Sequence, residues 1–322
     1  MLRSEGGTMI IHFNADNEPM RLDLYLCREL AGETRSTIQR LIETEHILIN
    51  GRPARSSLKL KGGENISVNI PAPTAAEPLP EEIPLEVLYE DVDLIVINKP
   101  AGMVVHPGPG NSSGTLVNAL LAHCTDLSGI GGELRPGIVH RLDKGTSGVL
   151  VAAKNDRTHN ALSAQFSVHS VKRIYQAIVY GNPKEDTGKI EGILGRHPTD
   201  RLRRSGAVRQ GKRAVTRWRV SERYSRLSFL ELRLETGRTH QIRAHMCEAG
   251  FPLVGDPLYP DGGRFNNLVD PQLRKMIIKL GRQALHAKIL GFIHPSSGEY
   301  MEFTSEIPDD MKELQAYLRQ MV

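Results

Sequence analysis

The most informative segment of the sequence is Gly137-Ile-Val-His140-Arg141-Leu142-Asp143-Lys144-Gly145-Thr146-Ser147-Gly148-Val-Leu-Val-Ala-Ala-Lys154. Its two apolar parts, residues 137–140 and 148–153, predict strands on either side of a loop of polar and small residues. Loops that a rigid scaffold holds in place often carry functional groups. The same residue types also suit an ordinary hairpin turn, so the loop alone leaves both interpretations open.

Asp143 is the only carboxylate in this stretch, and Arg141 and Lys144 lie beside it in the sequence. A nearby cation keeps a carboxylate ionised at neutral pH, as a carboxylate nucleophile must be. Asp143 is therefore the candidate catalytic residue.

Tyr175 begins an apolar strand directly after Lys172, Arg173 and Ile174. A tyrosine in this position can stack on a planar ligand or exchange a proton. An ordinary half-buried strand tyrosine has the same surroundings, so this segment also leaves two interpretations open.

Residues 234–245 predict the end of a strand, a glycine turn and the start of a helix. Hydrogen-bond donors crowd this helix start, with Arg238, His240, Gln241 and Arg243 close together. Such helix starts bind phosphate or carboxylate groups, although a solvated basic helix end has the same composition. His240 and His245 are five residues apart, which does not suit a helical zinc pair, and we expect no metal site.

Basic residues are concentrated between Arg196 and His245, where 14 Lys/Arg stand against 4 Asp/Glu, although the whole chain carries only +4. A local excess of this kind suits a polyanionic partner better than a small neutral metabolite. A solvated arginine-rich surface is the alternative.

The three cysteines are far apart and form no CxxC pair, which fits a reducing compartment and argues against a disulfide framework. No apolar run approaches the roughly 18 residues of a membrane span. We therefore expect a cytoplasmic protein without membrane association.

The 322 residues suggest two domains. The clearest boundary is residues 71–84, a linker with five prolines and three glutamates. We expect a tail with an edge strand at 1–19, a compact unit at 20–70, and a larger domain at 85–322. Strands and helices alternate irregularly, which favours an α+β fold with a mixed, largely antiparallel sheet.

Together these segments resemble the RluA/RluD family of pseudouridine synthases. The catalytic loop, tyrosine motif and arginine motif of that family match residues 140–148, 172–177 and 237–245, in order. Further matches lie at 98–100, 105–108, 196–199, 255–259 and 283–287. They cover nearly all of residues 85–310, and in combination they are highly specific.

Residues 20–70 resemble the S4 RNA-binding domain found in front of one branch of this family. The matching residues are Arg21-Leu22-Asp23, Arg35-Ser36, Gln39-Arg40-Leu41-Ile42 and Ile49-Asn50-Gly51. Two departures stand out: residues 43–46 lack the glycine that many S4 domains have, and residues 201–204 are more basic than the family leads us to expect.

The resemblance implies that the chain isomerises specific uridines to pseudouridine in structured RNA, above all large-subunit ribosomal RNA, after the target base leaves the helical stack. Asp143 would be the nucleophile or base, Arg243 would pair with it, and Tyr175 would stack on the uracil. Arg141 would fill the space left by the base. The expected RNA-binding residues are Arg141, Thr146, Lys172, Arg238, His240 and Gln241, with Arg35, Ser36, Gln39, Arg40 and Asn50 in the S4-like unit. No cofactor is required, and we expect a monomer whose partner is RNA.

Three other functions are possible from sequence. An RNA-binding module that has lost catalysis would need a damaged Asp, Tyr or Arg motif, and all three motifs are intact. A glycoside or nucleoside hydrolase typically uses two carboxylates, and the candidate loop offers one. A small-molecule enzyme fits the arginine excess poorly.

Overall fold

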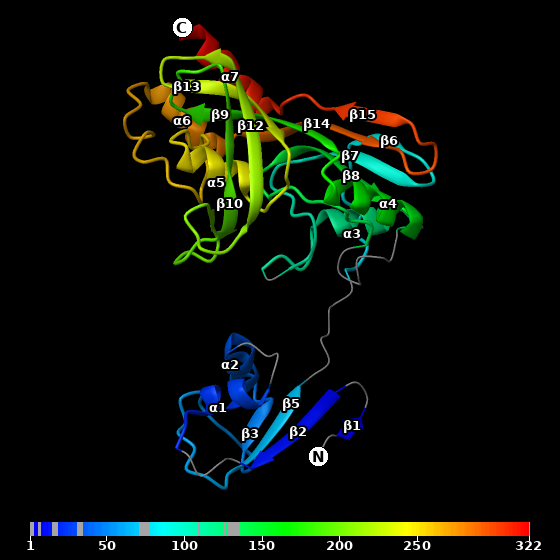
Figure 1. Cartoon of the computed structure of the whole chain (residues 1–322), viewed down its shortest axis with the longest axis vertical. Coiled ribbons are helices and arrows are strands. Elements are labelled where there is room, and N and C mark those ends of the chain that lie inside the picture. The colour runs from blue at the N-terminus through cyan, green and yellow to red at the C-terminus, as the bar shows by residue number, and fades with distance from the viewer. Residues whose placement is uncertain are drawn as a thin grey trace. The chain divides into compact units, whose positions relative to one another are not determined.

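The computed structural model describes residues 3–5, 8–14, 19–30, 35–70, 78–108, 110–124, 127 and 136–321. The chain divides into two compact units, residues 1–76 and 77–322 (Figure 1). Among the described residues, no helix combines the length and the apolar character that a membrane span requires.

The first unit is an antiparallel sheet in the order β1-β2-β5-β3-β4, packed against two helices. Its core joins Leu22, Leu26 and Ile38 from the helices to Ile47 and Ile66 from the sheet. The elements are β1 (Arg3–Glu5), β2 (Thr8–Asn14), α1 (Leu22–Glu29), α2 (Arg35–Glu43), β3 (Ile47–Ile49), β4 (Arg52–Pro53) and β5 (Asn65–Ile70).

The turn after α2 shows how the chain manages without a glycine at residues 43–46. Glu45 takes the left-handed backbone conformation, with φ of 59°. A glycine adopts this conformation at lower cost, because it has no Cβ to clash with the backbone. Helix α2 is therefore followed by a left-handed turn residue that is not a glycine and that adopts this conformation at a higher cost.

The second unit contains a ten-stranded sheet in the order β11-β10-β12-β13-β9-β14-β8-β7-β6, with β15 paired to β14. Only β8 and β14 pair in parallel among the described strands, which confirms the predicted α+β class with a mixed, largely antiparallel sheet. The strands before residue 200 are β6 (Val87–Glu90), β7 (Leu94–Lys99), β8 (Ser147–Ala153), β9 (Lys172–Tyr180) and β10 (Thr187–Arg196). The later strands are β11 (Arg204–Ser205), β12 (Lys212–Arg223), β13 (Leu227–Leu234), β14 (Leu285–Ile293) and β15 (Tyr300–Thr304).

In the part of this unit that the structure describes, five helices accompany the sheet: α3 (Leu116–His123), α4 (Asp156–Ser167), α5 (Gln241–Glu248), α6 (Pro271–Leu280) and α7 (Asp309–Gln320). The largest apolar core joins Leu116 and Leu120 of α3 and Ile242 and Met246 of α5 to the sheet. A separate core lies beneath α6 and α7, and a third surrounds Leu162 of α4. Each helix is thus held by burial of one apolar side.

The strand predicted for residues 137–140 is wrong. Ile138 forms only an isolated bridge with Ala152. The physical reason is His140, whose ring Nε2 accepts the backbone N–H of Val151 at 3.2 Å. A side chain therefore takes the hydrogen bond that a neighbouring strand would have taken, and the segment turns away as a loop.

Candidate active site

Asp143 lies in the loop that leads into β8, and a tight turn fixes its position. The backbone N–H of Thr146 donates to the Asp143 carbonyl at 2.9 Å. Gly148 follows with φ of 115°, and a Cβ there would lie 2.2 Å from the Ala287 carbonyl oxygen of β14. Only glycine allows this conformation and this approach, so the loop is anchored where β8 meets β14.

Residues from the far end of the chain brace the same loop. Gln283 donates from Nε2 to the Thr146 hydroxyl at 3.0 Å, and Arg282 donates from Nη1 to the Gly145 carbonyl at 3.1 Å. Asp310 of α7 holds the other edge of Arg282, at 2.7 and 2.8 Å. Thr146, an expected RNA-binding residue, is 2% exposed and occupied with this bracing.

Lys99 stabilises a turn that is hydrogen-bonded to this loop. Its side chain is fully buried, and Nζ donates to the Pro100 and Met103 carbonyls at 2.7 and 2.9 Å. The turn so formed donates the Gly102 N–H to the Lys144 carbonyl at 2.7 Å. Burial lowers the pKa of Lys99 to about 7, while nearby Asp143 favours its charged form. Residues 98–100 match the family in sequence, but nothing local in the sequence indicated a role for Lys99.

Arg243 of α5 is the ion-pair partner of Asp143. Its Nη1 donates to Asp143 Oδ2 at 3.1 Å, while Nε and Nη2 grip Asp256 at 2.7 and 2.8 Å. The guanidinium also lies over the Tyr259 ring, 5.2 Å from its centroid. Burial opposes the charge on Arg243, but the two carboxylates outweigh it and raise its pKa above the ordinary value.

Asp256 fixes Arg243 and was missed as a site residue by sequence reasoning. Its side chain is 0% exposed, and its Oδ1 also accepts the backbone N–H groups of Leu258 and Tyr259. The motif 255–259 matched the family in sequence, but nothing local indicated which residue it would hold. Arg141 and Lys144, the sequence neighbours of Asp143, form no ion pair with it in the part of the chain that the structure describes.

Tyr175 lies on β9 and lines the same pocket as Asp143 and Arg243. Burial raises the pKa of its hydroxyl, and the Asp143 charge raises it further, while Arg173 acts in the opposite direction. The ring is therefore neutral at physiological pH. The three residues predicted to form the site do converge, although they are far apart in the sequence.

Two hollows meet at Asp143. The smaller, with a volume of about 50 Å³, is lined by Asp143, Thr146, Tyr175 and Arg243. The larger, of about 490 Å³, extends from Asp143 past Arg173 to α4. We call the larger one the cleft. Arg141, Tyr175, Leu234 and Arg238 line both, so a ligand in the cleft would reach Asp143.

The remaining predicted residues of this unit lie in different settings. His240 places Nε2 3.8 Å from Asp143 Oδ1, and Arg238 lines both hollows. Gln241 is buried, and its amide is occupied by four hydrogen bonds, among them those to Thr236 and Thr216. Lys172 lies outside both hollows and pairs with Glu302 at 2.8 Å.

In the first unit, Gln39 donates to the buried Asp23 at 3.3 Å, and Arg21 grips the same carboxylate at 3.0 and 3.1 Å. Asn50 has φ of 50°, and its side chain accepts the backbone N–H of Asn65 at 2.9 Å. The side chains of Arg35, Ser36 and Arg40 lie outside the described residues.

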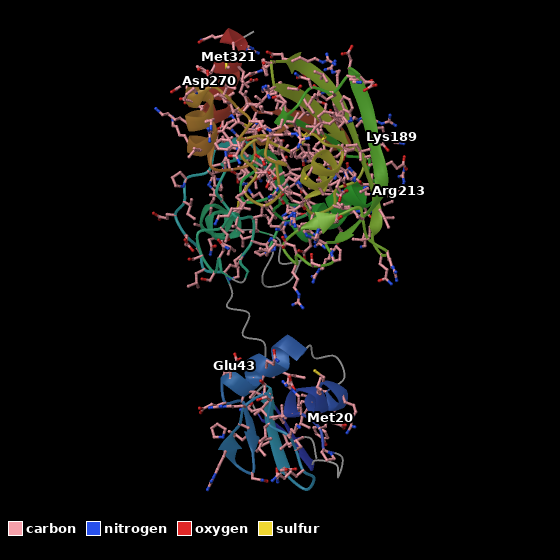
Figure 2. The ribbon with its side chains drawn as sticks, turned by 90° about the vertical axis from the view of Figure 1, so that its left-hand side faces the viewer. Met20, Glu43, Lys189, Arg213, Asp270 and Met321 are labelled. Carbon is pink, nitrogen blue, oxygen red and sulfur yellow. The ribbon has the colours of Figure 1, made fainter. Side chains whose placement is uncertain are left out.

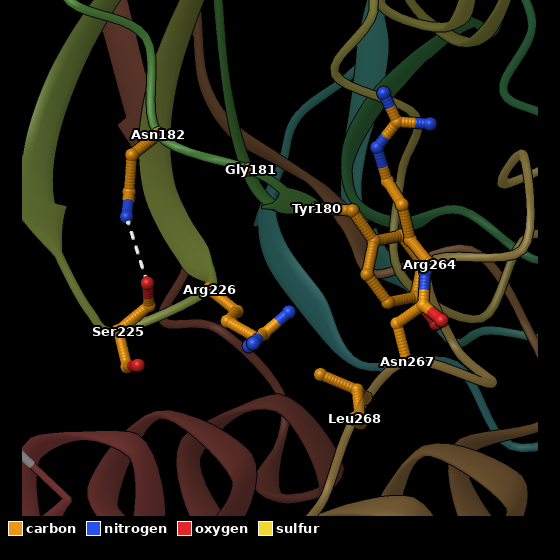
Figure 3. Close-up of a pocket in the computed structure, with 8 residues that line it drawn as sticks. All are labelled: Tyr180, Gly181, Asn182, Ser225, Arg226, Arg264, Asn267 and Leu268. Carbon is orange, nitrogen blue, oxygen red and sulfur yellow. Dashed lines mark hydrogen bonds between the residues drawn. The ribbon is translucent and has the colours of Figure 1, made fainter.

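Another hollow, of about 450 Å³, shares no lining residue with the cleft (Figure 3). Asn182 bridges its rim by donating to the Ser225 carbonyl at 3.2 Å. Arg264 is occupied by the carbonyls of Asp261 and Gly250. This hollow contains no carboxylate among its lining residues and no group poised for chemistry.

Comparison with known proteins gives the family. The model described as RNA pseudouridylate synthase matches residues 93–248, and the S4 domain model matches residues 20–66. The chain is 45% identical to the uncharacterized RNA pseudouridine synthase YlyB of Bacillus subtilis, over 93% of this chain and 94% of that protein. It is 46% identical to the ribosomal large subunit pseudouridine synthase D of Zymomonas mobilis, over 91% of this chain and 92% of that protein.

Among solved structures, human RNA Pseudouridylate Synthase Domain Containing 4 shares the fold, with a TM-score of 0.55 at 24% identity, over 73% of this chain and 93% of that chain. The carboxylate site in a basic cleft is consistent with an RNA-modifying enzyme, the class to which the similar proteins belong. Within that class, the chain belongs to the RNA pseudouridine synthase family, and the predicted family resemblance is confirmed.

Proposed function

We propose that this enzyme isomerises specific uridines in large-subunit ribosomal RNA, with Asp143 as the catalytic carboxylate. The substrate is supported by relatives named ribosomal large subunit pseudouridine synthase D. The catalytic role is supported by one observation above all: Arg243 holds Asp143 by an ion pair in a pocket that Tyr175 also lines.

The reaction is internal to one nucleotide. The bond between ribose C1′ and uracil N1 breaks, the uracil turns, and C1′ bonds to C5. The proton on C5 is lost and N1 gains one, so atoms and charge balance without a second substrate. Asp143 can act at C1′ or on the uracil ring, and either step needs its carboxylate to face the nucleotide. Tyr175, neutral and buried, provides a flat surface for the uracil.

The target base has to leave the RNA stack, at a cost of about a few kcal/mol. A volume of about 50 Å³ beside Asp143 exceeds the roughly 30 Å³ share of one water only slightly, so the nucleotide would enter through the cleft. Arg141 is exposed and lines both hollows, which suits it to occupy the gap that the base leaves in the RNA.

The S4-like unit, residues 20–70, would add phosphate contacts and hence affinity, while residues 85–322 supply the chemistry. The linker at 71–84 would join the two. This division accounts for the S4 match and the catalytic motifs lying in separate units.

The test uses purified enzyme, large-subunit ribosomal RNA transcripts and chemical mapping of pseudouridine. We expect the wild type to modify defined uridines and Asp143→Asn to form none, while its affinity for the same RNA stays within about threefold, since a neutral isostere keeps the shape of the site. Full activity of Asp143→Asn would refute the catalytic assignment. Release of free uracil would support a hydrolase instead.

A further inference from the structure

Arg173 is a buried arginine of the cleft, and no described residue forms an ion pair with it. It lies on β9 two residues before Tyr175, so both side chains point to the same side of the sheet. Arg173 is 6% exposed, and its guanidinium lies over the Phe166 ring, 5.8 Å from the centroid. No described residue accepts a hydrogen bond from its buried Nε or Nη2 atoms.

An arginine in this state is costly to the folded protein. The guanidinium cannot lose its proton, and a buried cation without a partner destabilises a fold by several kcal/mol. Burial lowers the pKa of Arg173, and Arg238 lowers it further, while Tyr175 acts in the opposite direction. A buried polar group without a partner calls for an explanation, and an anion that the site binds is one such explanation.

The unused atoms form a defined binding edge. Nε and Nη2 lie on one side of the guanidinium and together match two oxygens of one anion. The same two atoms grip Asp256 in Arg243 and Asp310 in Arg282. In Arg173 these two atoms are buried and have no hydrogen-bond partner among the described residues.

Among the described residues, the cleft offers no anion for that edge. Asp143 is the only carboxylate among its lining residues, and Arg243 already pairs with it. The other charged residues there are Arg141, Lys212 and Arg238, all cations. Surface cations behave differently: Lys189 and Arg213, labelled in Figure 2, both pair with Glu191.

Gly237 provides room for the arginine. A Cβ at this position would lie 2.4 Å from Arg173 Nη1, so any larger residue would displace the guanidinium. Since the obstacle is the end of a flexible side chain, the protein would still fold.

We propose that Arg173 binds a backbone phosphate of the RNA strand next to the target uridine, so that the cleft contains a phosphate subsite beside Asp143. This deepens the proposed function and rests on it. A phosphodiester carries a full negative charge and paired oxygens, whereas a uracil carbonyl provides neither.

The experiment measures binding of a fluorescent single-stranded RNA that contains one uridine, at a series of salt concentrations. We expect Arg173→Gln to weaken binding about tenfold and to reduce the slope of log affinity against log salt by about 0.7, the value for one lost phosphate contact on single strands. Arg233→Gln removes the same charge from the exposed face of the neighbouring strand and should keep the wild-type slope. Gly237→Ala should lower the slope as Arg173→Gln does, without removing any charge.

Methylphosphonate substitutions identify the partner. One uncharged linkage beside the uridine should weaken binding to the wild type and leave Arg173→Gln unaffected. The proposal would be overturned if Arg173→Gln bound the RNA as tightly as the wild type. It would also be overturned if the variant bound more weakly but kept the salt slope and the methylphosphonate sensitivity of the wild type. Competition by inorganic phosphate without any methylphosphonate effect would assign the site to free anions and overturn it too. These experiments measure binding, so they remain valid if the enzyme forms no pseudouridine. Failure to form pseudouridine would refute the proposed function but not the phosphate subsite.

Discussion

Arg243 and Arg173 are two buried arginines beside one active site, and among the described residues only Arg243 pairs with carboxylates. Arg243 is held by Asp256 and in turn holds Asp143. Arg173 lies over an aromatic ring, and no described acid pairs with it. The difference indicates two separate roles. Arg243 is paired with carboxylates of the protein because it positions Asp143, whereas Arg173 is left unpaired where a ligand can provide the negative charge.

Among the tests of this contrast between Arg243 and Arg173, the largest effect is expected for Asp256→Asn. The variant would leave Arg243 without its buried bidentate partner, and loss of one member of a buried pair costs about 3–5 kcal/mol of unfolding free energy. Urea denaturation measures the loss. The control is Arg319→Gln, which breaks an exposed pair with Glu222 and should cost less than about 1 kcal/mol. Equal losses in the two variants would contradict the role given to burial.

Arg243→Lys keeps the positive charge and removes the planar guanidinium with its several N–H donors. A single ammonium cannot hold Asp256 through two atoms and Asp143 through a third, as Arg243 does. We expect single-turnover pseudouridine formation to fall on the order of 100-fold, because the carboxylate loses its position, with little change in RNA affinity. A rate within a few-fold of the wild type would show that charge alone is sufficient.

Lys99 is a third buried cation and, unlike an arginine, can become neutral. Its folded pKa of about 7 lies below the ordinary value of 10.5, so above pH 7 the unfolded chain binds more protons and stability rises with pH until about 10.5. Between pH 7 and pH 8 this one group should add about 1 kcal/mol. Comparing denaturation of the wild type with Lys99→Met at both pH values isolates it, since the variant should lack that increment. The same increment in both proteins would exclude Lys99 as its source.

The smallest expected effect concerns Arg173. Arg173→Gln removes the cost of an unpaired buried cation but leaves a polar amide in the same buried place. The free energy of unfolding should therefore stay unchanged or rise by up to about 1 kcal/mol. Arg243→Gln, measured alongside, should lose several kcal/mol. A loss of similar size in both variants would mean that Arg173 has a structural role and would remove the contrast.

Much of the site could be predicted from its sequence. The motifs around Asp143, Tyr175 and Arg243 indicated one site, and the structure brings the three together. Their chemical roles remain predictions. The second partner of Arg243 could not be predicted, because Asp256 is an ordinary turn aspartate until the fold places it beside the arginine.

The choice between Lys172 and Arg173 shows a different limit. Lys172 was expected to bind RNA, yet it pairs with Glu302, while Arg173 lines the cleft. Strand alternation contains the signal, since Arg173 and Tyr175 are two residues apart and share a face. The failed strand at 137–140 had no such signal, because a histidine side chain replaced a backbone partner there.

The position of β14 has a consequence for synthesis of the enzyme. This strand lies between β8 and β9, yet it leaves the ribosome more than 100 residues after both. Until residues 285–293 emerge, the nascent chain has two separate sheet fragments with open edges and no brace from Arg282 or Gln283 on the catalytic loop. Such long-range pairing forms slowly and late. We therefore expect activity to arise only after β14 has joined β8 to β9.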